Sequence, residues 1–538
     1  MGIIKFKKNK NFNVFIQKDL SWKSIRFDKG KIFFKGEKDS VIKIFDLIKK
    51  CRYDLKKIKQ LLLKYNNCSS AIFFNNKYCV CFTDFCRSYP IFFRKDLNNI
   101  LISNSYKHLK KNKDFIDEES LSFIKLCGYS LGYNTLIKNI KIMKPGEILY
   151  SDNKNTKLEK YFEYHVTIKK NKLSKEKLKK KLSIIVDDII KNIIKKSNNR
   201  PIWVPLSGGL DSRLILCKLH ENGYKNLNCF SYGLKNNAES LIAKDIAKSL
   251  NIHWRFIELK KNNYVSFYSS SEKKKFDDFS DNLQVVPNYQ DFLVIKKMLN
   301  DKVLSQEAII INGQSGDFNT GNHIPESLIK KNNFKNFLES LKKKHFFLFK
   351  SDDNPYFNNI VDRFFTDYLK FNKVFKKNLT DLYEKWEYEE RQIKYVVNGQ
   401  KTYDFWGIDW FLPLWDSEFV KFWTSVDKRY RYKQNLYKEF LNDWNYKNLF
   451  RRKFTLNSHT GLLAFFIKLL SFSLKISSSR EKIISYFDYF SRYGFYYQYV
   501  KFSKYLKLRG KIKNPTSIHL LTWMNQKEIF KNIREFKN

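Results

Sequence analysis

The nine residues PLSGGLDSR, Pro205 to Arg213, constrain this chain more than any other stretch. They follow the apolar run IWV and open a segment with helical spacing, which predicts a turn between a strand and a helix. Gly208 and Gly209 allow close backbone approach, and N–H groups at a helix N-terminus attract anions. Asp211 would repel a phosphate unless Mg²⁺ lay between them. The loop therefore predicts a site for a nucleotide and magnesium.

An ordinary Gly-containing turn with a serine N-cap is the plainer interpretation of a lone Gly-Gly pair. The complete string SGGLDS after an apolar strand is much more specific. Its spacing differs from GxxxxGK[ST] and from GxGxxG, which argues against ordinary kinases and dinucleotide enzymes.

Apolar runs alternate with helical patterns from Pro201 onward. Strands are expected at IWVPL, NLNCFSY, HWRFIEL and AIIIN, with helices over Ser212 to Asn222 and Ala238 to Leu250. This alternation predicts a parallel sheet covered on both faces. Leu173 to Lys196 is expected to form an amphipathic helix leading into this domain, and an all-helical region is expected beyond about residue 325.

The first 165 residues have a different pattern, with short strand-like runs separated by turn residues. These runs are Lys31 to Phe34, Ser70 to Phe74, Tyr78 to Thr83 and Ile91 to Phe93. We therefore predict an α/β protein with a first part at residues 1–165 and a second beginning at residue 173.

The chain carries 102 Lys and Arg against 54 Asp and Glu, a formal charge of +48, while 43% of its residues are hydrophobic. So apolar a composition excludes a disordered chain. The charge suits nucleic acid, which binds cations by counterion release, or an anionic membrane surface. A compositional bias is the simpler interpretation, because lysine is spread through every segment.

Eight cysteines and no run of about 20 uncharged apolar residues indicate reduced thiols in a cytoplasmic protein. Cys79, Cys81 and Cys86 are either metal ligands or, in the interpretation we favour, buried thiols. Gly461 to Ile476 is apolar almost all round, as in a core helix; an interfacial helix is the alternative, with peripheral contact at the inner membrane face.

The loop and three further stretches resemble the asparagine synthetase family of the ATP-pyrophosphatase loop superfamily. The stretches are FSYGLKNNAESLIAKDIAKSL (230–250), INGQSGDFNTG (311–321) and WGIDWFLPLWDSEFVKFW (406–423). In that superfamily ATP is cleaved between its α and β phosphates and the acceptor is adenylated. The resemblance covers about residues 60 to 455, which implies three parts in all, at residues 1–165, 173–455 and 456–538.

The resemblance implies ATP and Mg²⁺ as cofactors, with Asp211 and Asp317 as metal ligands. Tyr232 and Gly313 would lie at the adenine. The implied nucleotide-binding loop consists of Pro205, Leu206, Ser207, Gly208, Gly209, Asp211 and Ser212. A family lysine neutralises departing pyrophosphate; here Gln434 stands at the expected position, and Lys433 or Lys438 could substitute.

Gln314 stands where the family has a glutamate that takes a proton from the attacking amine. Glutamine cannot act as a general base at neutral pH. Either another group does so, or the nucleophile and substrate differ from ammonia and aspartate. His323 is a candidate base, and a structural histidine that caps a turn is the alternative.

The first part resembles the family's glutaminase domain, an Ntn-hydrolase-like αββα fold. TDFCRSYPIFF (83–93), NIKIMKPGEILY (139–150) and Tyr161 carry this likeness. Glutamine-using members have Cys after the initiator Met, whereas this chain begins Met1, Gly2, Ile3. The likeness therefore implies a glutaminase-like domain without glutaminase activity.

Taken together, the motifs predict an ATP-dependent amide-forming ligase. Its carboxylate is aspartate, another small metabolite or a sugar acid of a surface polysaccharide. Its nitrogen comes from ammonia, an amine or a separate ammonia-supplying subunit, and a homodimer is one option for the assembly. An RNA-modifying ATP-pyrophosphatase is the alternative, although neither a CxxC pair nor an RNA-binding module is visible. A non-catalytic relative would have no need of SGGLDS and Asp317.

Overall fold

The computed structural model describes residues 3–451 except 8–11, 18–19, 28–29, 66–68, 97–98, 153, 165–172, 234, 347, 349–354 and 373–377. The expected third part, 456–538, and its apolar segment Gly461 to Ile476 lie outside the described residues. Within these ranges, no helix is long and apolar enough to cross a membrane.

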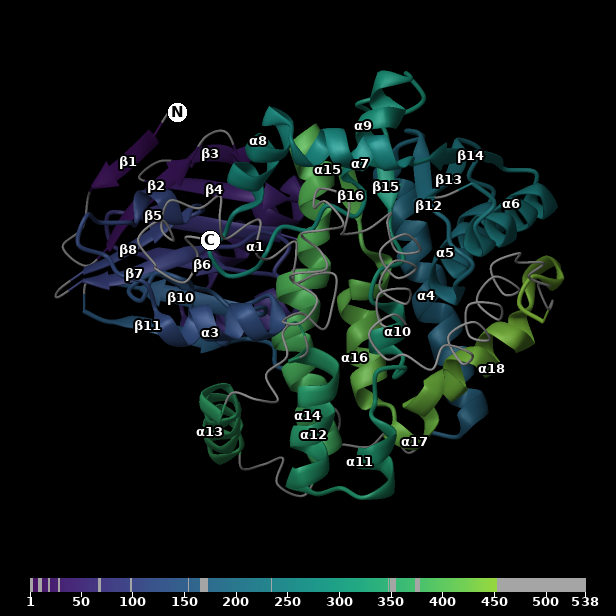
Figure 1. Cartoon of the computed structure of the whole chain (residues 1–538). Coiled ribbons are helices and arrows are strands. Elements are labelled where there is room, and N and C mark those ends of the chain that lie inside the picture. The colour runs from purple at the N-terminus through teal and green to yellow at the C-terminus, as the bar shows by residue number, and fades with distance from the viewer. Residues whose placement is uncertain are drawn as a thin grey trace.

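Two β-sheets form the N-terminal part of the molecule, at the left of Figure 1. One sheet has the order β1 (Ile3–Lys7), β2 (Phe12–Gln17), β8 (Asn99–Ser103), β7 (Phe92–Asp96), β9 (Lys141–Ile142). The other has the order β11 (Thr156–Lys160), β10 (Glu147–Ser151), β6 (Cys79–Phe82), β5 (Ser69–Asn75), β4 (Gly30–Gly36), β3 (Lys23–Phe27).

Side chains alternate between the two faces of the second sheet, as the period of a strand requires. Ile72 packs between the sheets, whereas Ala71 and Phe73 pack against helices α1 (Lys38–Lys50) and α2 (Leu55–Tyr65). Helix α3 (Glu118–Cys127) packs beside β7 and β9 of the first sheet. The layers therefore run helix, sheet, sheet, helix, and the assignment to the Ntn-hydrolase type stays a prediction.

The thiols of Cys79 and Cys81 lie between the two sheets, with their sulfur atoms 3.7 Å apart. Cys86 is also buried. In the described ranges, no group of three or more His, Cys, Asp or Glu side chains is arranged to hold a metal ion. All three thiols are buried, which agrees with the interpretation that they pack in the core.

The predicted parallel sheet is confirmed, together with the mixed α/β class. Its order is β14 (His253–Glu258), β13 (Leu227–Gly233), β12 (Ile202–Pro205), β15 (Ile309–Ile311), β16 (Asp409–Phe411), and every neighbouring pair is parallel. Val204 and Cys229 face one helical layer, and Trp203 and Phe230 face the other. Such burial on both faces explains why the central strands β12 and β15 are apolar runs without alternation.

Helices cover both faces of this sheet. The first layer contains α4 (Lys175–Ser197), α5 (Leu210–Glu221), α6 (Ala238–Leu250), α16 (Ser417–Ser425) and α18 (Asn435–Trp444). The second contains α9 (Phe292–Asn300) and α15 (Lys401–Trp406), with α7 (Lys261–Tyr268) and α8 (Ser271–Ser280) beside them. Ser174 and Asn237 cap α4 and α6, close to the predicted starts.

A helical region joins the two sheet systems, and a long green helix runs down the centre of Figure 1. It comprises α10 (Gly316–Asn319), α11 (Glu326–Lys330), α12 (Phe334–His345), α13 (Pro355–Phe371), α14 (Leu379–Glu387), the π-helix η4 (Tyr388–Val396), η5 (Val397–Gln400) and α17 (Lys428–Arg431). Single 3₁₀ turns are η2 (Tyr106–His108), η6 (Pro413–Trp415), η7 (Tyr432–Gln434) and η8 (Tyr446–Asn448).

The expectation of an all-helical region beyond residue 325 is wrong at one place. Strand β16 adds an edge to the parallel sheet by pairing with β15. It is only three residues long, and its first residue, Asp409, is exposed. So short a strand has no recognisable alternation, and its pairing with a segment about 100 residues earlier is a tertiary effect.

One ion pair inside the helical region generates a stability prediction. Arg431 of α17 makes two hydrogen bonds to Glu384 of α14, of 2.5 and 2.7 Å, and both side chains are at most 1% exposed. We expect Glu384→Met to destabilise the protein by about 3–5 kcal/mol, because it leaves a buried cation unpaired. The paired variant E384M/R431M should recover most of this loss in urea unfolding.

The matched control is Arg429→Met, since Arg429 is 80% exposed in its pair with Asp427. It should change the unfolding free energy by less than about 1 kcal/mol. Equal losses in E384M and R429M would contradict the importance of the buried pair.

Candidate functional site

Two loops meet at the carboxyl edge of the parallel sheet, because they follow the neighbouring strands β12 and β15. The first loop leads into α5 and the second into α10. They approach closely: a Cβ added at Gly313 would lie 2.8 Å from the Ser212 backbone nitrogen, and one at Gly316 would lie 2.4 Å from the Asp211 side-chain Cγ. Only glycine at both positions permits this approach.

The contact brings Asp211 and Asp317 together. Burial and then the negative charge of Asp317 raise the pKa of Asp211 to about 7, although hydrogen bonds from the Tyr437 hydroxyl and the Asp317 backbone N–H oppose this shift. The Tyr437 hydroxyl donates to Asp211 Oδ1 at 2.9 Å. Two carboxyl groups held this close repel one another unless a proton or a cation lies between them.

His323 lies behind this pair and between two acids. Its Nε2 is 2.9 Å from Asp317 Oδ2, and its Nδ1 is 2.5 Å from Glu387 Oε1. Burial alone would lower the pKa of His323, but Glu387 and Asp317 raise it to about 9. The imidazole is therefore protonated at neutral pH and cannot accept a proton, which favours the structural role over that of a base.

The same cation acts on Asp317. Burial alone would raise the pKa of Asp317, but the hydrogen bond and charge of His323 bring it below its usual value. Asp317 is therefore ionised, and its negative charge contributes to the raised pKa of Asp211.

A cavity of about 780 Å³ opens above the two loops. Among the predicted site residues, its walls include Pro205, Leu206, Ser207, Gly209, Asp211, Ser212, Tyr232, Gly313, Gln314, Asp317 and His323. Gly208 does not line it; a Cβ there would lie 3.1 Å from Ile242 Cδ1, so this glycine allows α6 to pack against the loop.

The first loop is held in shape by its own side chains and by Arg213. Ser207 Oγ accepts a hydrogen bond from Gly209 N at 3.1 Å, and Arg213 donates to Gly208 O at 2.6 Å. Arg213 also donates to Leu449 O at 2.9 Å, which ties the loop to the far end of the described chain.

The predicted lysines do not reach the cavity. Lys438 donates instead to Lys433 O at 2.8 Å at an exposed position, and neither residue lines the walls. Gln434, which stands at the expected lysine position, donates to Thr320 Oγ1 at 2.7 Å. The wall does contain Arg391 of η4, whose Nη1 lies 3.6 Å from Glu387 Oε1.

Arg391 was missed because the segment YEERQIKYV has the composition of a solvated helix face. In the fold most of this segment is buried. Its π-helical turns place Arg391, Gln392, Tyr395 and Val396 in the wall of the cavity. Such helices are rare and are found often at functional sites. A highly charged run inside an aromatic-rich region is the one signal that could have identified it.

Asp291 is a second wall residue that sequence reasoning missed. The Tyr232 hydroxyl donates to its Oδ1 at 2.5 Å, and the Tyr403 hydroxyl donates to its Oδ2 at 2.6 Å. Tyr232 is thus fixed at the predicted adenine side of the cavity. No sequence motif marks Asp291, which lies just before α9.

The donor set at the loop contact fits magnesium bound to a polyphosphate. Mg²⁺ in such sites takes one or two carboxylates and completes its shell with phosphate oxygens and water. Asp211 and Asp317 supply the two carboxylates, and the start of α5 supplies backbone N–H groups for the phosphates.

A substitution at the loop contact tests this geometry. Gly316→Ala places a methyl group where the Asp211 carboxyl group lies, so it should separate the two acids. We expect Mg²⁺-dependent ATP binding to weaken about tenfold or more in calorimetry, as disturbing the support of a metal ligand typically does. The control is Gly223→Asn, because Gly223 has open space around it and Asn tolerates its φ of +71°. Equal ATP affinity in both variants would contradict the contact's role.

Comparison with known proteins gives one match to a family and one solved structure of interest. No curated protein matches the chain. A glutamine phosphoribosylpyrophosphate amidotransferase from B. subtilis, solved in complex with ADP and GMP, aligns at 9% identity and a TM-score of 0.17. The alignment covers 55% of this chain and 59% of that one, so the chain spans less than two thirds of its length. Residues 193–269, which contain the SGGLDS loop and strands β12 to β14, match the asparagine synthase family model.

Proposed function

We propose that this chain is an ATP-dependent ligase that activates a carboxylate as its acyl adenylate, releases pyrophosphate and transfers the acyl group to an amine. One observation carries the proposal: Asp211 and Asp317 meet across two strand-end loops inside a large cavity. The match of residues 193–269 to the asparagine synthase family supports the reaction class.

Different cavity residues would bind the metal, the phosphates and the adenine, according to their position. Asp211 and Asp317 would hold Mg²⁺, which supplies charge neutralisation at the triphosphate when bound. Ser207, Gly209 and Ser212 would bind the phosphates through hydroxyl and backbone N–H groups. Tyr232, held by Asp291, would position the adenine.

Arg391 would neutralise the charge that develops on departing pyrophosphate, in place of Lys433 or Lys438. It is the one Arg or Lys among the cavity-lining residues in the described part of the chain. Its neighbour Glu387 contacts His323, which contacts Asp317, so the guanidinium belongs to the metal side of the cavity. Fixed cations at a leaving group are among the largest contributions to catalysis.

Several cavity-lining side chains carry amide groups rather than charges. Gln314 accepts a hydrogen bond from Gln400 at 2.5 Å, and Gln392 accepts one from Ser315 at 2.8 Å. Asn288 and Gln290 also line the cavity. Amides both donate and accept hydrogen bonds, which suits hydroxyl groups. A polyhydroxylated sugar acid is therefore a second candidate beside aspartate.

Removing either carboxylate should strongly reduce the rate of pyrophosphate release. We expect Asp211→Asn and Asp317→Asn to lower pyrophosphate release by roughly 100-fold or more, as loss of electrostatic stabilisation typically does. The assay uses ATP, Mg²⁺ and a panel of amino acids, uronic acids and amines. The control is Asp409→Asn, an exposed acid on β16. Activity in both variants equal to that of the wild type would overturn the proposal, and strict dependence on RNA would favour an RNA-modifying enzyme.

The nitrogen donor would be ammonia, an amine or the product of a separate subunit. In the described N-terminal part, the thiols of Cys79, Cys81, Cys86 and Cys127 are buried, and the thiol of the half-buried Cys51 donates to the Ile48 carbonyl at 3.2 Å. Burial raises the pKa of Cys81 and of Cys127, so neither is a reactive thiolate at neutral pH. We therefore expect the isolated chain to form no glutamate from glutamine, while ammonium salts support pyrophosphate release. Glutamate formation without any partner would contradict this expectation.

A further inference from the structure

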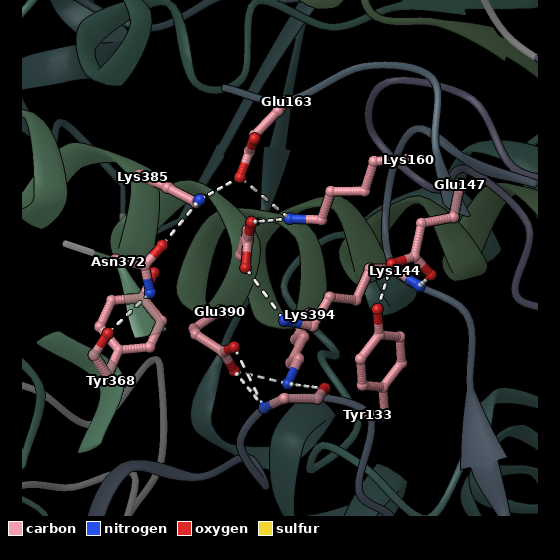
Figure 2. A network of polar contacts seen from close by, with 12 residues as sticks. Tyr133, Lys144, Glu147, Lys160, Glu163, Tyr368, Asn372, Lys385, Glu390 and Lys394 are labelled. Carbon is pink, nitrogen blue, oxygen red and sulfur yellow. Dashed lines mark hydrogen bonds and ion pairs between the residues drawn. The ribbon is translucent and has the colours of Figure 1, made fainter. Parts of the chain in front are cut away.

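A network of charged side chains lies buried between the N-terminal part and the π-helix η4 (Figure 2). Glu389 of η4 pairs through Oε1 with Lys160 Nζ at 2.6 Å and through Oε2 with Lys144 Nζ at 3.1 Å. Its side chain is 3% exposed. Burial alone would raise the pKa of Glu389, but the lysines lower it to about 2, so it is ionised.

A second set of contacts continues the network along η4. The backbone N–H of Gly132 donates to Glu390 Oε1 at 3.1 Å. Lys394 donates to Glu390 at 2.5 Å and to the carbonyl groups of Ser130 and Gly132 at 2.8 and 2.9 Å. One segment of the N-terminal part, near Ser130 to Gly132, is thus bonded to two successive turns of η4.

The other side of η4 belongs to the cavity. Arg391, Gln392, Tyr395 and Val396 line it. The residues that bond the N-terminal part and those that line the cavity therefore alternate along one helix. A shift of η4 along or about its axis would displace Arg391 and Gln392 together.

Stability alone does not account for so many buried charges. Apolar side chains of similar volume often stabilise a fold as well as a buried ion pair does, because both ions must lose their hydration. Buried charges that must pair do, however, select one register over others. The π-helical geometry of η4 also favours a functional role, since π-helices are rare and frequently occur at functional sites.

We propose that the N-terminal part is a positioning element of the ligase site: through Lys144, Lys160 and Gly132 it fixes the register of η4 and thereby the placement of Arg391 in the cavity. The inference rests on the proposed function for the role of Arg391. It gives this part of the chain a task that requires no glutaminase chemistry. Lys144 and Glu389 act through Arg391 and are positioning residues.

A double-mutant cycle on the full chain tests the proposal, with Mg²⁺-ATP as the probe in calorimetry. The network variant is K144M/E389Q, which removes a cation and an anion together, and the second change is Arg391→Met. We expect each to weaken Mg²⁺-ATP binding about tenfold. The combined variant should bind no more weakly than R391M alone, because the network acts through that residue. Losses that multiply, or a network variant with wild-type affinity, would overturn the proposal.

The control variant is K59M/E159Q, an ion pair within the N-terminal part whose side chains are 33% and 37% exposed. It should keep wild-type affinity, and the charge-preserving Lys144→Arg should retain most of it. If K144M/E389Q fails to fold, Lys160→Met replaces it in the cycle, since Lys160 is partly exposed.

Hydrogen exchange separates this inference from the proposed function. Amides of residues 388–396 should exchange at least tenfold faster in the network variant than in the wild type or in K59M/E159Q. A wild-type chain that does not bind Mg²⁺-ATP would defeat the proposed function. Unchanged exchange at 388–396 in the network variant would defeat the positioning role, whatever the outcome with ATP.

Discussion

The backbone contact between two strand-end loops is the constraint on which the rest of the site depends. Gly313 and Gly316 let the loop after β15 lie directly against the start of α5. This approach places the carboxyl groups of Asp211 and Asp317 close together. Burial and the charge of Asp317 both raise the pKa of Asp211. His323 relieves part of it by holding a positive charge behind Asp317. The two carboxyl groups line the cavity, and a bound cation would relieve the repulsion between them.

The two sheet systems do not behave as independent bodies. One hydrophobic cluster contains Phe73 and Val80 of the N-terminal part as well as Trp203 and Ile310 of the parallel sheet. The buried ion pairs around η4 add directional contacts to this apolar interface. Apolar packing resists separation of the parts, whereas the ion pairs select one arrangement among those that packing would allow. A helix shared by the interface and the cavity is the route by which one could influence the other.

Local patterns in the sequence predict most of the parallel sheet, because an apolar run followed by a helical pattern marks β12 with α5 and β13 with α6. The loop Pro205 to Arg213 and the second acid, Asp317, also follow from local motifs. The cation at the cavity wall, Arg391, does not follow from a local motif. Lys433 and Lys438 are near the expected position in the chain, but neither lines the cavity, and the turn there has an αL backbone at Lys433 and Gln434. Arg391 reaches the cavity through packing of η4 between distant segments, and β16 forms only because β15 is beside it. Such long-range contacts leave no local periodicity.

The central claim is that Asp211 and Asp317 share one magnesium ion that a nucleotide also contacts. The most direct measurement is a crystal structure of the full chain with Mg²⁺ and α,β-methylene-ATP. We predict a metal bound by both carboxylates at about 2.1 Å, with phosphate oxygens completing its shell, the α-phosphate facing Gln314 and the β-phosphate facing Arg391. A nucleotide bound elsewhere, or a metal that touches neither carboxylate, would contradict it.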